Sequence, residues 1–175
     1  MILKLAIILF IVSVGIISFL SLNGNEFIKL DLNLINEKNV AFWHVYKSNM
    51  ILICKIFFLG VTTISLYSIF SYVQNILSIG IIANGLVNEG YGRLAAKMIP
   101  HGAIEFIGIS LAVSTVIWIW IFIIKNIVKI IKCEVSVKDV IKKIIGTTIV
   151  FLMVCSVVFA VAGIIEVMIS HYKVI

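Results

Sequence analysis

The residues of this chain whose types and spacing could do chemistry are His101 and Glu105. Pro100, just before them, suits the first turn of a helix, where its missing N–H costs no hydrogen bond. His101 and Glu105 are four residues apart, so they share one face of that helix. No formal charge follows between Phe106 and Ile124. An ionisable pair at the mouth of such a membrane-length segment marks a candidate functional site, although the pattern names no reaction.

The elements that position this pair are long apolar segments. The chain has 175 residues and is 62% hydrophobic, with a mean hydropathy of +1.23. This composition excludes a disordered chain and argues against an ordinary soluble core. Apolar runs of about 20 residues are typical of membrane spans. We therefore predict one all-α domain, a polytopic membrane helical bundle of about five transmembrane helices, with spans near 5–22, 50–70, 76–87, 100–124 and 144–166.

Two of these spans leave alternatives open. Residues 5–22 either form an uncleaved first span or a signal peptide, and the poor cleavage site after Ser18 favours the span. Residues 50–87 are too long for one pass and predict two, with the best break near Ser71–Asn75 and an earlier one near Ser68. The second of these passes contains Asn84 and Gly85, so it is either a short span or a partly re-entrant segment.

The charge pattern predicts topology. The net charge of +6 would suggest nucleic acid in a soluble protein, but here the basic residues lie between apolar runs, so we expect no nucleic-acid partner. We call the face on which the chain begins side one and the opposite face side two. Residues 125–143 carry six lysines and are predicted to form an interfacial basic loop on side one, made of one or two amphipathic helices. By the positive-inside rule, side one is cytoplasmic and the C-terminus is outside.

Five full passes would bring scattered polar residues to one membrane face. On side two this predicts a polar cluster of Asn49, Asn84, His101, Glu105 and Glu166. Lys55 lies about 9 Å deeper than Asn49 along a helix, where it could pair with Glu105 or Glu166. A structural interpretation competes at each position, because caps, turns and headgroup contacts also place polar residues at the ends of spans.

Signals for cofactors and metals are weak. The three cysteines, Cys54, Cys133 and Cys155, are far apart and form no disulfide framework or zinc motif. His101, Glu105 and Glu166 are the weak metal candidates, since zinc sites usually use three or four clear ligands. The chain contains no H-E-x-x-H, G-x-S-x-G or phosphate-loop motif. We therefore expect no cofactor and no resident metal.

Several motifs together carry a family resemblance. Asn84-Gly85 with Gly90, the Pro100-His101-Gly102 element with Glu105, and Gly163 with Glu166 resemble the stage II sporulation protein M family. Asn49 and Gly60 look like that family's first motif, with Ser48 where the family often has a second Asn. The resemblance covers residues 49–166, and Pro-His-Gly-x-x-Glu is its most specific part.

The resemblance implies a five-span bacterial membrane protein, similar to the anchor of peptidoglycan-degrading partners during engulfment. We therefore expect a non-enzymatic scaffold or accessory subunit whose partners are the lipid bilayer and other membrane or cell-wall-acting proteins, or a second copy of the chain. The alternative is a membrane component of circular bacteriocin production, export or immunity. The third interpretation, an intramembrane metalloenzyme, has the weakest signal.

Overall fold

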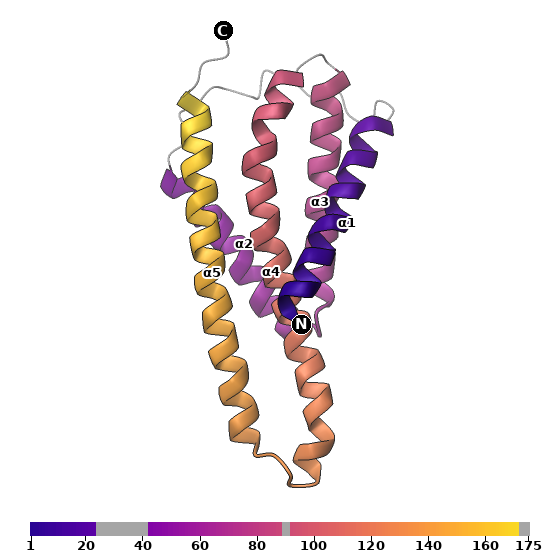
Figure 1. Ribbon diagram of the computed structural model, residues 1–175, viewed down its shortest axis with the longest axis vertical. Coiled ribbons are helices and arrows are strands. Elements are labelled where there is room, and N and C mark those ends of the chain that lie inside the picture. The colour runs from indigo at the N-terminus through magenta and orange to yellow at the C-terminus, as the bar shows by residue number, and fades with distance from the viewer. Residues whose placement is uncertain (24–41, 89–91, 172–175) are drawn as a thin grey trace.

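The part of the chain that the structure describes folds into five helices (Figure 1). The computed structural model describes residues 1–23, 42–88 and 92–171, and their side chains except at 22–23, 86–88, 92–101 and 169–171. The helices run alternately up and down, so α1 starts toward the end where α4 and α5 are joined, and α5 ends toward the other. They are α1 (Ile2–Asn23), α2 (Phe42–Thr62), α3 (Leu66–Asn88), α4 (Gly92–Ile131) and α5 (Val137–His171).

Every one of these helices is long and apolar enough to cross a membrane. A helix satisfies its backbone hydrogen bonds internally, which is why apolar segments adopt it in hydrocarbon. These findings confirm the predicted all-α membrane bundle of five spans.

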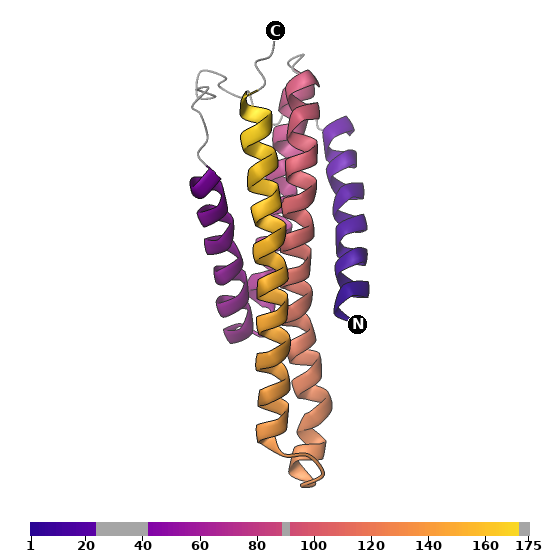
Figure 2. The ribbon, with the colours of Figure 1, turned by 60° about the vertical axis from the view of Figure 1, so that its left-hand side comes forward.

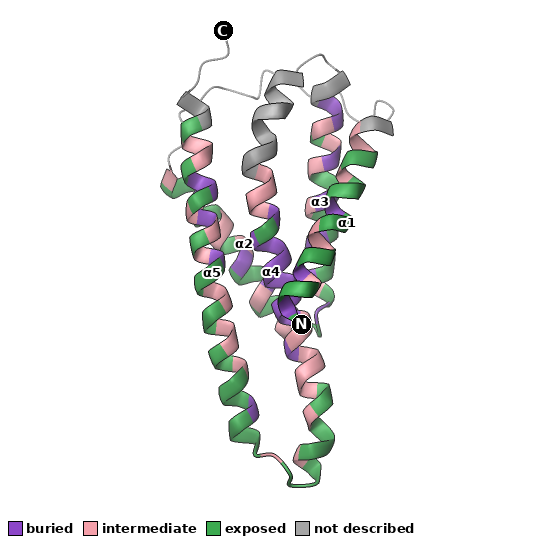
Figure 3. Ribbon diagram, in the orientation of Figure 1, coloured by how far each residue is buried: buried purple, intermediate pink, exposed green. Residues whose placement is uncertain are grey.

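Helix α4 is the centre of the bundle and contacts each of the other four helices. Its segment from Phe106 to Val116 is buried almost throughout, whereas α1 faces outward along most of its length (Figure 3). Close approach is made possible by glycine. A Cβ atom at Gly108 of α4 would lie 2.6 Å from the ring of Phe159, and one at Gly80 of α3 would lie 2.7 Å from Leu20 of α1. Small residues at such contacts let membrane helices pack closely, as α4 with α5 and α3 with α1 do here.

The break between the second and third spans lies earlier in the chain than predicted. Helix α2 ends at Thr62 and α3 begins at Leu66, so Ser71–Asn75 belongs to α3. The backbone reverses at Ile64 and Ser65, whose φ angles of 53° and 71° lie in the left-handed region. Hydroxyls of Thr62 and Thr63 accompany this turn by donating to the Leu59 carbonyl. Helix α3 also continues through Gly80 and Gly85, which excludes a re-entrant segment there.

The basic segment 125–143 is mostly helical. Helix α4 continues through Ile131 and α5 begins at Val137, so the lysines lie on a helical hairpin. Its predicted interfacial position remains a prediction. The Trp120 side chain donates a hydrogen bond to the Val61 carbonyl (3.2 Å), which aligns Trp120 with the end of α2. The eleven residues from there to Ile131 extend the hairpin about 16 Å further. Figure 2 shows α4 and α5 projecting together beyond the start of α1 and the end of α2.

Candidate functional site

The structure joins two of the predicted site residues directly. Asn49 of α2 donates a hydrogen bond through Nδ2 to Oε1 of Glu105 on α4, and both side chains are half-buried. Asn49 is seven residues from the start of α2, which places this contact about 10 Å inside the bundle from side two. An amide donor on a carboxylate compensates part of its lost hydration, so the contact also ties α2 to α4.

Asn84 has a different set of partners. Its Nδ2 donates to the carbonyl oxygens of Leu20 (3.3 Å) and Ser21 (3.1 Å), at the end of α1. The last four carbonyls of a helix have no acceptor role within that helix. Asn84 therefore caps α1 from α3, one turn beyond the close contact of Gly80 with Leu20. This contact belongs to the α1–α3 side of the bundle.

The other predicted residues lie on α2, α4 and α5. Lys55 is exposed, and within the described residues no ion pair joins it to Glu105 or Glu166. Glu166 is half-buried on α5, three residues beyond Gly163, which packs against Phe42 of α2. His101 lies on α4, and its side chain is outside the described residues. The five-residue cluster at side two remains a prediction.

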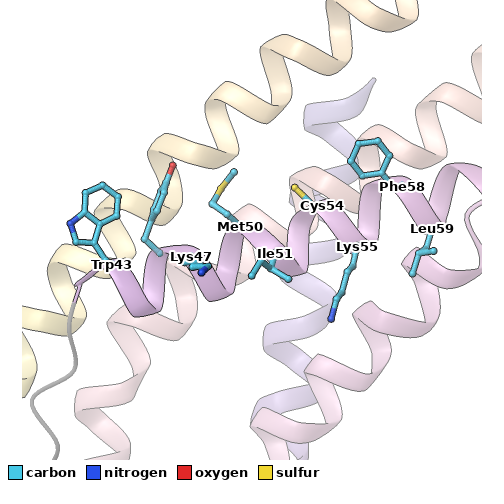
Figure 4. A pocket seen from close by; sticks show the side chains of 9 residues that line it. Trp43, Lys47, Met50, Ile51, Cys54, Lys55, Phe58 and Leu59 are labelled. Atoms are coloured by element: carbon cyan, nitrogen blue, oxygen red, sulfur yellow. The ribbon is translucent and has the colours of Figure 1, made fainter.

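Lys55 instead belongs to an open groove on the outer face of α2 (Figure 4). The groove has a volume of about 680 Å³ and is lined by residues of α2 alone, among them Trp43, Met50, Cys54 and Phe58. Phe58 and Trp43 are strongly exposed along it. Since such a surface faces hydrocarbon in a membrane, lipid acyl chains fit it, and the long Lys55 stem can carry its ammonium toward the interface.

The sequence analysis missed a polar contact in the centre of the bundle. The Tyr72 hydroxyl of α3 forms hydrogen bonds with Ser13 of α1 and, at 3.0 Å, with Ser110 of α4. All three side chains are buried. The sequence favours a break between two spans near Ser71–Asn75, whereas Tyr72 uses its hydroxyl to join three helices. A tyrosine placed between long apolar runs was the available signal, because a buried hydroxyl needs a partner.

The described residues contain no group of three His, Cys, Asp or Glu side chains placed to hold a metal ion. One hydrogen-bond donor to Glu105 is the amide nitrogen of Asn49. Within the described part of the chain, the site therefore includes a carboxylate and an amide donor that face each other from two helices.

A family model for stage II sporulation protein M matches residues 5–171 of the chain. The chain belongs to this family. The match covers all five helices and confirms the resemblance inferred from the Pro-His-Gly-x-x-Glu element and its companions. Membership in the stage II sporulation protein M family supports a multi-pass membrane protein related to sporulation. No curated protein and no solved structure matches the chain.

Proposed function

We propose that this protein is a non-enzymatic membrane scaffold, an accessory subunit that holds other proteins of a complex at the membrane. The observation that carries the proposal is how the bundle uses its polar side chains. Asn49–Glu105, Tyr72 with Ser13 and Ser110, and Tyr46–Ser156 (2.7 Å) each join different helices. These groups, together with Asn84 and Trp120, tie all five helices into one body.

The projecting hairpin supplies a surface outside the bilayer for a partner. Its six lysines, Lys125, Lys129, Lys132, Lys138, Lys142 and Lys143, are all exposed. Beside them runs an exposed aliphatic row at helical spacing on α4, Ile124, Ile127, Val128 and Ile131. A row of this kind flanked by lysines fits an acidic partner with an apolar face. On this proposal the partner binds on side one, at a distance from Glu105.

The family adds the kind of complex. The resemblance implies peptidoglycan-degrading partners, and such enzymes act outside the cytoplasmic membrane. With side one cytoplasmic, these partners meet side two, near the half-buried Glu105 and Glu166. A scaffold of this design contacts proteins on both faces of the membrane, because five passes leave segments that connect the helices exposed on each face.

The test is site-specific photocrosslinking in the native host, with a photoreactive residue at Ile127 or Ile131 of the hairpin and at Ile107 beside Glu105. Ile11, which is 63% exposed on the lipid-facing side of α1, is the matched control. We expect discrete adducts with other proteins from Ile127, Ile131 and Ile107, and no such adduct from Ile11. Finding no protein adduct at any of the three overturns the scaffold proposal. If the trapped protein is instead a bacteriocin precursor or its exporter, the bacteriocin role replaces the scaffold proposal.

A further inference from the structure

The only glutamine of the chain, Gln74, lies on the outer surface of α3. Its side chain is exposed and forms no hydrogen bond with any described residue. The neighbouring Tyr72 and Ile76 are buried against the bundle, so Gln74, two residues from each, points away from it. Ser78, one turn further along α3, is exposed on the same face.

Gln74 is also deep in the membrane. It is eight residues from the start of α3 at Leu66, about 12 Å along the helix, and eleven residues from Gly85, about 16 Å. It stands two residues from Tyr72, which bonds to Ser13 and Ser110 in the middle of their helices. Its amide therefore lies near the centre of a hydrocarbon layer of about 30 Å.

Lipid cannot satisfy an amide at this depth. Hydrocarbon offers neither donors nor acceptors, so an exposed primary amide loses its hydration there without replacement. A glutamine side chain of about 5 Å cannot span the distance of about 12 Å to the nearer end of its helix. A second helix packed on this face of α3 would supply the missing partners.

The surroundings of Gln74 suit such contact. Apart from Gln74 and Ser78, the exposed residues of the face are apolar and repeat at intervals of three and four: Leu66, Phe70, Val73 and Leu77. Helix α3 contains no Asp, Glu, Lys or Arg, although the chain as a whole carries +6. Among the described residues α3 does not contact α5. A helix docked on α3 would thus meet no charge and would leave the outer side of α5 open.

We infer that this face of α3 binds the same face of a second copy of the chain, with the two Gln74 amides hydrogen-bonded to each other across a twofold axis. An amide carries both donors and an acceptor, so two identical side chains satisfy one another reciprocally. Twofold interfaces place the same patch on both subunits and need this self-complementarity. We assign the face to a second copy because the Gln74 amide of that copy supplies the donors and the acceptor that the exposed amide needs.

The experiment measures association of the full chain in lipid vesicles, by single-molecule photobleaching of a fluorescent label over a series of protein-to-lipid ratios. We expect dimers whose fraction rises with protein density. Gln74→Leu should weaken association by about tenfold, while Gln74→Asn, which keeps an amide, should retain more of it. Ser18→Leu, a polar-to-apolar change on the exposed side of α1, is the matched control and should associate like the wild type.

Folding is checked separately, since Gln74 has no hydrogen bond in the described chain and Gln74→Leu should keep the wild-type melting temperature in detergent. A second readout is disulfide formation from Leu77→Cys, with Val12→Cys on α1 as its control, after Cys54 and Cys133 are replaced by Ser. Crosslinked dimers from Leu77→Cys alone support the α3 interface. A wild-type chain that stays monomeric at every density overturns it, as does a Gln74→Leu chain that dimerises like the wild type. The proposal is also overturned if the wild type is monomeric and binds a different membrane protein that Gln74→Leu no longer binds. That result would assign the face to the other protein.

Discussion

The two halves of α4 have similar hydrophobic composition and opposite surroundings. From Phe106 to Val116 the helix is buried on nearly all sides, with Val113 and Val116 fully enclosed. From Ile124 to Ile131 the same helix exposes its aliphatic residues, and Ile131 is 75% exposed. Figure 3 shows the change along the one helix. Burial along α4 therefore follows the number of neighbouring helices and not hydrophobicity. Four helices surround the segment from Phe106 to Val116, whereas the segment from Ile124 to Ile131 has mainly α5 beside it.

The largest effect on stability is expected from Phe159→Ala, at the contact between α5 and the buried half of α4. The Phe159 ring is fully buried and covers Gly108. Removing it leaves a cavity, and we expect a loss of about 3 kcal/mol in the free energy of unfolding. Phe58→Ala, at a 66% exposed ring on α2, should change it by less than about 0.5 kcal/mol. Reversible unfolding in mixed micelles measures both, and equal losses would show that the interior at Gly108 is not closely packed.

The comparison within α4 is sharpened by a pair of identical substitutions. Val113 is fully buried and Val128 is 54% exposed. We expect Val113→Ala to cost about 2 kcal/mol and Val128→Ala less than about 0.5 kcal/mol, because only the first leaves a void. The same unfolding measurement decides. If Val128→Ala were as costly as Val113→Ala, Val128 would be packed against another part of the purified chain and would not be exposed.

The polar contact at the side-two end should have an intermediate effect. A double-mutant cycle on Asn49→Leu and Glu105→Gln isolates the coupling between the two side chains, which we expect to be about 1 kcal/mol. Asn75→Leu, whose amide bonds only within α3 to the Ser71 carbonyl, serves as the control and should show no coupling to Glu105→Gln. A coupling of zero would mean that Asn49 and Glu105 contribute independently.

The same variants test the remaining chemical interpretation. A scaffold predicts negligible zinc, manganese and iron in both the wild type and Glu105→Gln, measured by elemental analysis of the purified chain. A stoichiometric metal in the wild type that disappears in Glu105→Gln would establish a metal site at Glu105 and would contradict the scaffold proposal.

Hydropathy and motif spacing predicted the number of helices, their class and their family, because each span must satisfy its own backbone hydrogen bonds over about 20 residues. The boundaries were less predictable. The mainly polar stretch Ser71–Asn75 favours a break between spans, but Ser71 and Tyr72 are buried in α3. A polar side chain in a membrane segment marks either the end of a helix or a hydrogen bond to a neighbouring helix. The sequence does not show which, since the partners of Tyr72, Ser13 and Ser110, are remote in the chain.

The candidate site shows the same limit. Counting residues places Asn49 and Glu105 near one membrane face, and the structure joins them. Depth along a helix follows from the sequence, whereas the direction in which a side chain points depends on how the neighbouring helices are packed. Asn84 and Lys55 illustrate this, since Asn84 faces α1 and Lys55 lies on the outer groove of α2.

The smallest effect on stability is expected at the tip of the hairpin, from the double change Lys129→Glu and Lys132→Glu. Both lysines are exposed on the projecting hairpin, Lys129 on α4 and Lys132 in the turn directly after it. Exposed charges contribute little to folding, so the free energy of unfolding should change by less than about 0.5 kcal/mol. The same change reverses the charge that an acidic partner would meet, so crosslinking from Ile127 should fall severalfold in the host. Lys4→Glu, near the start of α1 and away from the hairpin, is the matched charge reversal and should leave that crosslinking unchanged. An unaltered adduct yield with Lys129→Glu and Lys132→Glu would show that the exposed half of α4 binds through its aliphatic row alone, and a comparable loss with Lys4→Glu would trace the effect to net charge instead.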